Sequence, residues 1–174
     1  MNRLYIFALT AIALLCLAVS SPPKWALAAQ QTAQQSAKTN LEIDLPEVVA
    51  EVRAAYDRYN QAVNSNNVAV LDATFRNDPR TIRYGNAENL YGYKEIEAYR
   101  GAIRPPAGPP RTLSKTVITT YGRDFAVAST LTLRANAPGK VGRQMQTWVR
   151  LPEGWRVVAA HVSTIDAPPA DRPQ

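Results

Sequence analysis

The second half of the chain has the hydrophobic pattern of strands, and this pattern constrains the fold more than any other feature. Four β-rich segments cover residues 112–121, 125–135, 141–151 and 155–165. Short turn-forming sequences separate them: Gly122-Arg123-Asp124, Ala137-Pro138-Gly139-Lys140 and Pro152-Glu153-Gly154. Three hairpin-like connections in a row predict an antiparallel meander of four long strands.

The first half of the folded part has helical spacing instead. Apolar side chains recur every three or four residues from Pro46 to Asn64 and predict one amphipathic helix: Val48, Val52, Ala55, Tyr56, Tyr59 and Val63. A shorter helix over 68–75, a short strand over 81–85 and a third helix over 93–102 follow. A Pro-rich loop then leads into the strands.

Helices followed by strands predict an α+β domain with the helices on one face of the sheet. A curved antiparallel sheet closed by about three helices forms a cone with a central pocket. Such a pocket is a natural site for a small ligand. We expect this domain to cover residues 41–166.

The N-terminus predicts export. Arg3 provides a positive charge, residues 4–19 are apolar, and Ala26-Leu27-Ala28 fits a signal-peptidase site, so residues 1–28 are interpreted as a signal peptide. The alternative is an uncleaved anchor, although the apolar run is shorter than the roughly 20 residues of a membrane span. After cleavage we expect a periplasmic or secreted protein without a stable membrane span. Its folded domain would be flanked by a disordered spacer over 29–40 and a loose Pro-rich tail over 167–174.

Composition excludes several classes of protein. Cys16 and His161 are the only cysteine and the only histidine, so disulfides and a His/Cys metal cluster are excluded within one chain. Cleavage removes two basic residues and no acidic one, so the formal net charge of +6 falls by two. No run of lysine and arginine with interleaved aromatics predicts nucleic-acid binding. A basic pocket for a small acidic molecule fits this balance better.

Cofactor motifs are absent from the sequence. It contains no G-x-G-x-x-G, no P-loop, no H-E-x-x-H and no C-x-x-C. We therefore expect a pocket that uses neither a cofactor nor a metal.

Several long runs resemble one family: DPRTIRYG (78–85), ENLYG (88–92), TVITTYGRDF (116–125), GRQMQTWVR (142–150) and PEGWRVVAAHVS (152–163). Together they resemble the AtzH-like family of the nuclear-transport-factor-2-like superfamily, also called SnoaL-like or cystatin-like α+β barrels. Its relatives include oxalurate-catabolism proteins.

The resemblance implies a role beside amidases in purine-ureide or triazine-ring catabolism. It implies a cofactor-independent hydrolase or decarboxylase of a small ureido carboxylate such as dicarboxyurea, with a non-catalytic binding domain as the alternative. It also implies a homodimer through the sheet face and an amidase as a partner. The chain departs from the family in its export signal and in Met145, where a small polar residue is expected.

Tyr59 and Arg83 are the residues that we expect to be catalytic. Tyr59 lies on the apolar stripe of the first helix, so it is either a core tyrosine or a phenol aimed into the cone as a proton donor. A guanidinium of Arg83 facing the cone would bind a carboxylate through two hydrogen bonds. The alternatives for Arg83 are a surface position and an ion pair with Asp78 or Glu88.

Further candidates for substrate contact come from the first helix and the last two strands: Tyr56, Arg143, Gln146, Trp148 and His161. Gln146 and Trp148 share one face of their strand with Gln144, whereas Arg143 lies on the other face. The length of the turn at 151–154 decides which of these two faces meets His161.

His161 alternates with Trp155, Val157, Ala159 and Ser163 on the last strand. It is either a pocket base suited to neutral pH or a packed residue at an interface. Arg100 either caps the third helix or reaches the mouth of the pocket.

Overall fold

The computed structural model describes residues 23–24, 41–102 and 109–168. The chain divides into two compact units, residues 1–40 and 41–174. Only Pro23 and Lys24 are described in the first unit, and both are exposed. The interpretations of residues 1–22, 25–40 and 169–174 lie outside the described residues. Within those described, no helix has the length and apolar character needed to cross a membrane.

Three helices form where the sequence predicts them. Helix α2 (Pro46–Ser65) has proline in its first turn and ends at Asn66, which adopts the left-handed conformation. Helix α3 (Val68–Thr74) is capped by Asn67, whose side chain accepts a hydrogen bond from the Val70 amide at 3.2 Å. Helix α4 (Tyr93–Ala102) starts directly after Gly92, whose φ of 85° requires glycine.

Six strands form one sheet in the order β2-β1-β6-β5-β4-β3. The strands are β1 (Ile82–Tyr84), β2 (Asn89–Tyr91), β3 (Thr112–Tyr121), β4 (Phe125–Leu133), β5 (Lys140–Leu151) and β6 (Gly154–Asp166). The predicted meander of four long strands is confirmed. The sheet is not purely antiparallel, however, because β1 pairs parallel with β6, from Ile82–Ala159 to Tyr84–His161.

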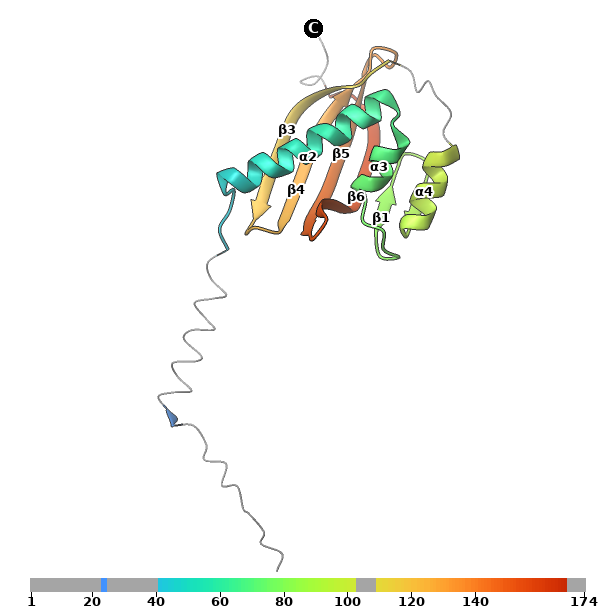
Figure 1. The fold of residues 1–174 in the computed structure, drawn as a ribbon. Helices are drawn as coiled ribbons and strands as arrows, with labels where there is room; N and C mark the ends of the chain where they lie inside the picture. The colour runs from blue at the N-terminus through green and yellow to red at the C-terminus, as the bar shows by residue number, and fades with distance from the viewer. Residues whose placement is uncertain (1–22, 25–40, 103–108, 169–174) are drawn as a thin grey trace, which may run out of the picture. The chain divides into compact units, whose positions relative to one another are not determined.

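The helices cover one face of the curved sheet, and Figure 1 shows α2 lying across β3, β4 and β5. We call the covered face the inner face and the opposite one the outer face. Alanines 126 and 128 are fully buried beneath the helices, and their small side chains leave room for the larger side chains of the core. The large buried side chains between these layers are Trp148, Tyr56, Phe75, Ile96 and Val157.

An irregularity in β6 determines which side chains face inward. Thr147 pairs with Ala159 while Trp148 pairs with Val157, so Val158 is an extra residue in the β6 ladder. Val157 lies inside, and beyond the bulge Ala160 is the next buried residue. The simple alternation predicted for this strand is therefore wrong past Val157.

Candidate functional site

A cavity of about 220 Å³ opens between the three helices and the inner face. Four arginines line it, together with two tyrosines, two amides and three aliphatic side chains: Arg83, Arg100, Arg111, Arg134, Tyr59, Tyr99, Asn66, Gln144, Val63, Leu71 and Val162. Among the described residues, no aspartate or glutamate lines it. The cavity is thus strongly cationic, with one apolar wall.

Arg111 is the buried centre of this charge. Its side chain donates to Gln144 Oε1 at 2.9 Å and to Asn60 Oδ1, and both partners are neutral amides. In the part of the chain that the structure describes, no aspartate or glutamate forms an ion pair with Arg111. Its Nε has no hydrogen-bond partner there either. Burial lowers the pKa of Arg111, but a guanidinium stays charged in a protein.

Helix α2 holds Arg111 in place through two asparagines one turn apart. Asn64 donates to the Arg111 carbonyl at 3.2 Å and accepts from its amide at 3.1 Å. Asn60 holds the guanidinium and donates to the Tyr56 carbonyl at 2.8 Å. The orientation of the guanidinium is therefore fixed before any ligand binds, which is what an anion site requires.

Arg134 supplies a second cation without an acidic partner among the described residues. Its Nη1 donates to the Pro109 carbonyl at 2.9 Å. Thr112 pairs with Leu133, so Arg111 and Arg134 flank the same end of the β3–β4 ladder. Two guanidiniums at one strand end attract an anion more strongly than either alone.

The other two arginines are neutralised by carboxylates. Arg83 pairs with Glu88, and its guanidinium carbon lies 5.3 Å from the centroid of the Tyr99 ring. Arg100 donates to Asp72 Oδ1 at 2.9 Å and to the Leu71 carbonyl at 2.8 Å. Arg100 therefore does not cap α4, which was one of its two expected roles. It links α4 to α3 and lines the cavity.

Tyr59 combines the two roles that the sequence left open. Its ring packs against Phe75 and Trp148 with centroid distances of 6.3 and 6.5 Å. It also lines the cavity, and the guanidinium carbon of Arg111 lies 5.9 Å from its ring centroid. The structure thus places both residues of the predicted pair, Tyr59 and Arg83, on one cavity.

Three other candidates lie in the core rather than on the cavity wall. Tyr56 is fully buried, and its hydroxyl accepts from Gln144 Nε2 at 3.3 Å. Burial raises the pKa of Tyr56, so the phenol is neutral. Gln146 and Trp148 are buried on the inner face, and neither the Gln146 amide nor Trp148 Nε1 has a partner among the described residues. The even-numbered face of β5 therefore meets the interior.

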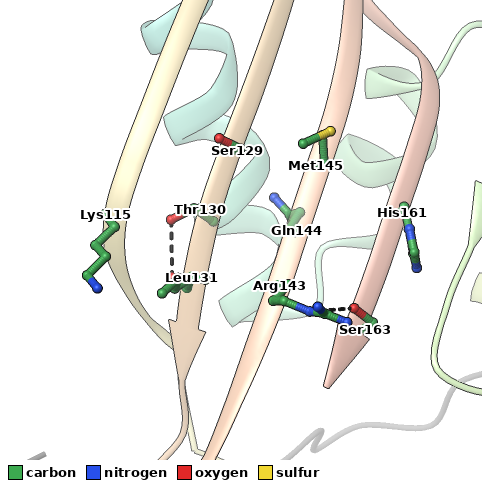
Figure 2. A pocket seen from close by; sticks show the side chains of 9 residues that line it. All are labelled: Lys115, Ser129, Thr130, Leu131, Arg143, Gln144, Met145, His161 and Ser163. Atoms are coloured by element: carbon green, nitrogen blue, oxygen red, sulfur yellow. Dashed lines mark hydrogen bonds between the residues drawn. The ribbon is translucent and has the colours of Figure 1, made fainter. Parts of the chain in front are cut away.

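Arg143 and His161 lie on the outer face, away from the cavity. Figure 2 shows them beside a separate, open groove of about 480 Å³, with Arg143 Nε donating to Ser163 Oγ at 3.1 Å. The expectation that either side chain contacts a ligand in the cone is wrong for this cavity. For His161 the cause is the bulge at Val158, which separates its face from that of Trp155 and Val157.

Sequence reasoning missed Arg111, Arg134 and Asn60. A signal for the two arginines was present, because one precedes the first long strand and the other follows the second. In an antiparallel hairpin these positions are neighbours. Metal sites are not suggested, since the described residues contain no group of three histidine, cysteine, aspartate or glutamate side chains close enough to bind one.

Comparisons with known proteins agree with this architecture. The AtzH-like family profile matches residues 41–168. A solved structure of a protein with unknown function from the DUF3225 family of Pectobacterium atrosepticum is 54% identical, with a TM-score of 0.69, and the match covers 73% of this chain and all of that one. A cystatin-like fold protein from Burkholderia xenovorans is 44% identical over 74% of this chain and all of its own, also with a TM-score of 0.69.

A more distant match shows the wider fold class. A nuclear transport factor 2-like superfamily protein from Salmonella enterica serovar Typhimurium is 24% identical, covering 71% of this chain and 94% of its own, with a TM-score of 0.56. No curated protein matches the chain. The profile match over residues 41–168 shows that the chain belongs to the AtzH-like family, within the nuclear-transport-factor-2-like fold.

Proposed function

We propose that the cavity binds a small carboxylate, with Arg111 as its principal contact. The observation that carries this proposal is a buried, pre-oriented guanidinium that contacts two neutral amides and the Tyr59 ring but forms no ion pair with a carboxylate in the described part of the chain. Burying a charge without a counter-charge is costly, and a bound anion would remove that cost. The sequence of residues 1–28 predicts export, so we propose that the protein binds this carboxylate outside the cytoplasm.

We further propose that the ligand is a ureido carboxylate and that the protein breaks it down without a cofactor. For an N-carboxylate, loss of CO₂ breaks the C–N bond and leaves its electron pair on nitrogen. The Tyr59 hydroxyl would supply the proton that this nitrogen takes up, and the nearby Arg111 would stabilise the phenolate until water restores the proton. Binding without turnover is the alternative, and one assay separates the two.

Tyr59→Phe should reduce turnover by about 100-fold or more, because a positioned general acid contributes roughly that much. Ligand affinity and melting temperature should change little, because the ring and its packing remain. The assay follows the release of CO₂ or urea from allophanate and related N-carboxylated ureas, with affinity measured by calorimetry.

Tyr56→Phe is the matched control, because Tyr56 lies in the same helix but outside the cavity. It should keep full turnover. Equal losses in both variants would contradict the role of Tyr59 as proton donor. Binding of these carboxylates without any turnover by the unmodified protein would favour the alternative of a binding domain.

We also propose that two copies associate through the outer face. No described helix covers this face, and Val117, Met145 and Tyr91 are each more than half exposed on it. Strand spacing and rise give the face roughly 700 Å² per copy, close to the about 800 Å² of a standard interface.

Met145→Glu should convert a dimer into a monomer, because Met145 lies on a central strand and a charge there would be buried on association. Light scattering after gel filtration measures the mass. Gln61→Glu adds the same charge on the exposed side of α2 and should leave the mass unchanged. A monomeric unmodified protein would overturn this assembly.

A further inference from the structure

The four arginines of the cavity differ in how much of their charge is available to a ligand. Arg111 and Arg134 have no carboxylate partner among the described residues, whereas Arg83 pairs with Glu88 and Arg100 with Asp72. One side of the cavity can therefore bind an anion directly. The other side offers guanidiniums whose charge is already balanced.

The Arg83–Glu88 pair is positioned to affect a ligand. The side chains of Arg83 and Glu88 are only 18% and 13% exposed, so salt screens their interaction weakly. Arg83 reaches the cavity wall, while Glu88 lies behind it and also accepts from the Ala87 amide at 3.2 Å. Burial acts to raise the pKa of Glu88, but the hydrogen bond and charge of Arg83 hold it below its ordinary value, so this carboxylate is ionised near neutral pH.

Glycine at position 85 makes room for this carboxylate. A Cβ built on Gly85 would lie 1.8 Å from Glu88 Oε1 and 2.6 Å from Oε2. The colliding atoms are the end of a flexible side chain, so Gly85→Ala would displace the Glu88 carboxylate rather than the backbone. The pair can thus be disturbed either by removing the charge of Glu88 or by pushing its carboxylate aside.

Removing the Asp72 carboxylate would not make the charge of Arg100 available to a ligand in the same way. Arg100 also donates to the Leu71 carbonyl, and its guanidinium carbon lies 4.2 Å from the centroid of the Phe75 ring. These contacts would hold Arg100 in place without Asp72. Glu88, by contrast, is the carboxylate whose loss would turn a cavity-lining arginine toward a ligand.

We infer that Glu88 determines how many anionic groups the ligand carries. By pairing with Arg83, it restricts the cavity to ligands with one carboxylate, bound at Arg111, and a neutral polar group at the Arg83 side. A second carboxylate there would meet a balanced ion pair and the nearby negative charge of Glu88. This inference rests on the proposed binding of a carboxylate at Arg111. It favours ureido carboxylates with a single carboxylate over dicarboxyurea, which carries two.

Succinamate and succinate test the inference, because the two compounds have nearly the same shape and differ by one anionic group. The unmodified protein should bind succinamate at least as tightly as succinate. Glu88→Gln should raise the affinity for succinate about tenfold, because the freed Arg83 gains a charge-assisted contact. The affinity for succinamate should change less than about twofold, as a tenfold change requires a new strong contact.

Gly85→Ala should shift the ratio of the two affinities in the same direction, but less, because it displaces the carboxylate without removing its charge. Glu153→Gln removes an equal charge from the exposed β5–β6 turn and should leave the ratio unchanged. Calorimetry at fixed ionic strength measures the dissociation constants, and melting temperatures without ligand show that each variant folds.

The outcomes distinguish the inference from the function on which it rests. Two results would overturn the carboxylate site itself. One is that the unmodified protein binds neither compound, and the other is that the Arg111→Met variant binds both compounds as tightly as the unmodified protein does. Binding that depends on Arg111, with a ratio that neither Glu88→Gln nor Gly85→Ala alters, overturns the role of Glu88 alone. A twofold preference for succinate in the unmodified protein also overturns it.

Discussion

Arg111→Met should weaken the binding of carboxylates by about 30-fold or more. Losing one partner of a buried, hydrogen-bonded charge pair costs about 2–5 kcal/mol, and each 1.4 kcal/mol corresponds to a factor of ten. Arg111 is the buried cation of the cavity that pairs with no acidic residue in the described ranges. Methionine retains much of its length but neither its charge nor its donors. Calorimetric titration of the variant with a carboxylate checks this loss.

The stability of Arg111→Met without ligand should change far less than its affinity, because two effects oppose each other. Removing a desolvated charge stabilises the folded state. Leaving Asn60 Oδ1 and Gln144 Oε1 without their donor destabilises it by about 1–3 kcal/mol for each buried acceptor.

Arg111→Lys is the informative control. It keeps the charge but not the rigid fork that contacts both amides, so it should recover only part of the affinity. An affinity that none of these substitutions alters would mean that the anion binds elsewhere and that Arg111 is structural.

Trp148→Ala should lower the free energy of unfolding by about 3–5 kcal/mol, the usual cost of truncating a large buried aromatic side chain. Trp148 is fully buried, and its ring packs against Tyr56 at a centroid distance of 6.4 Å and against Tyr59 at 6.5 Å. Urea denaturation followed by circular dichroism measures the loss.

Trp148→Phe should cost clearly less than the alanine variant. Phenylalanine fills most of the space and also removes an indole N–H that has no partner among the described residues. Equal costs for both variants would show that the indole itself, rather than its volume, stabilises the core. Tyr59 loses its neighbour in the alanine variant, so turnover should fall there and persist in the phenylalanine variant.

The fold was largely predictable because its elements are long and regular. The helix over 46–64 and the four strands carry clear periods, and each of these elements appears in the structure within a few residues of its expected ends. The parallel pairing of β1 with β6 was not predictable in this way. It joins segments that are far apart in sequence, and a three-residue strand carries almost no pattern to specify its neighbour.

The site was predictable only in part, for a related reason. The position of Tyr59 on the cavity wall could be predicted because a helical stripe fixes its direction. For Arg83 the sequence left the face of its strand open, and the structure shows both a place on the cavity wall and the ion pair with Glu88 that was the alternative. The face of His161 was left open by the sequence. A single extra residue, Val158, reverses the alternation and turns His161 to the outer face, and the sequence around it gives no sign of a bulge. Arg111 was missed because it follows a proline-rich segment, outside any periodic element.

The parallel contact between β1 and β6 determines the order in which the chain can fold. Ile82 and Tyr84 pair with residues 159 and 161, and the Arg76 amide donates to the Val157 carbonyl at 2.9 Å. The segment that holds Arg83 therefore finds its partner only after β6 has been synthesised. Closing so long a loop is slow compared with forming helices and hairpins. The meander of β3 to β6 forms from local contacts, whereas the cationic cavity is completed last, so a chain truncated before β6 would have no ligand site.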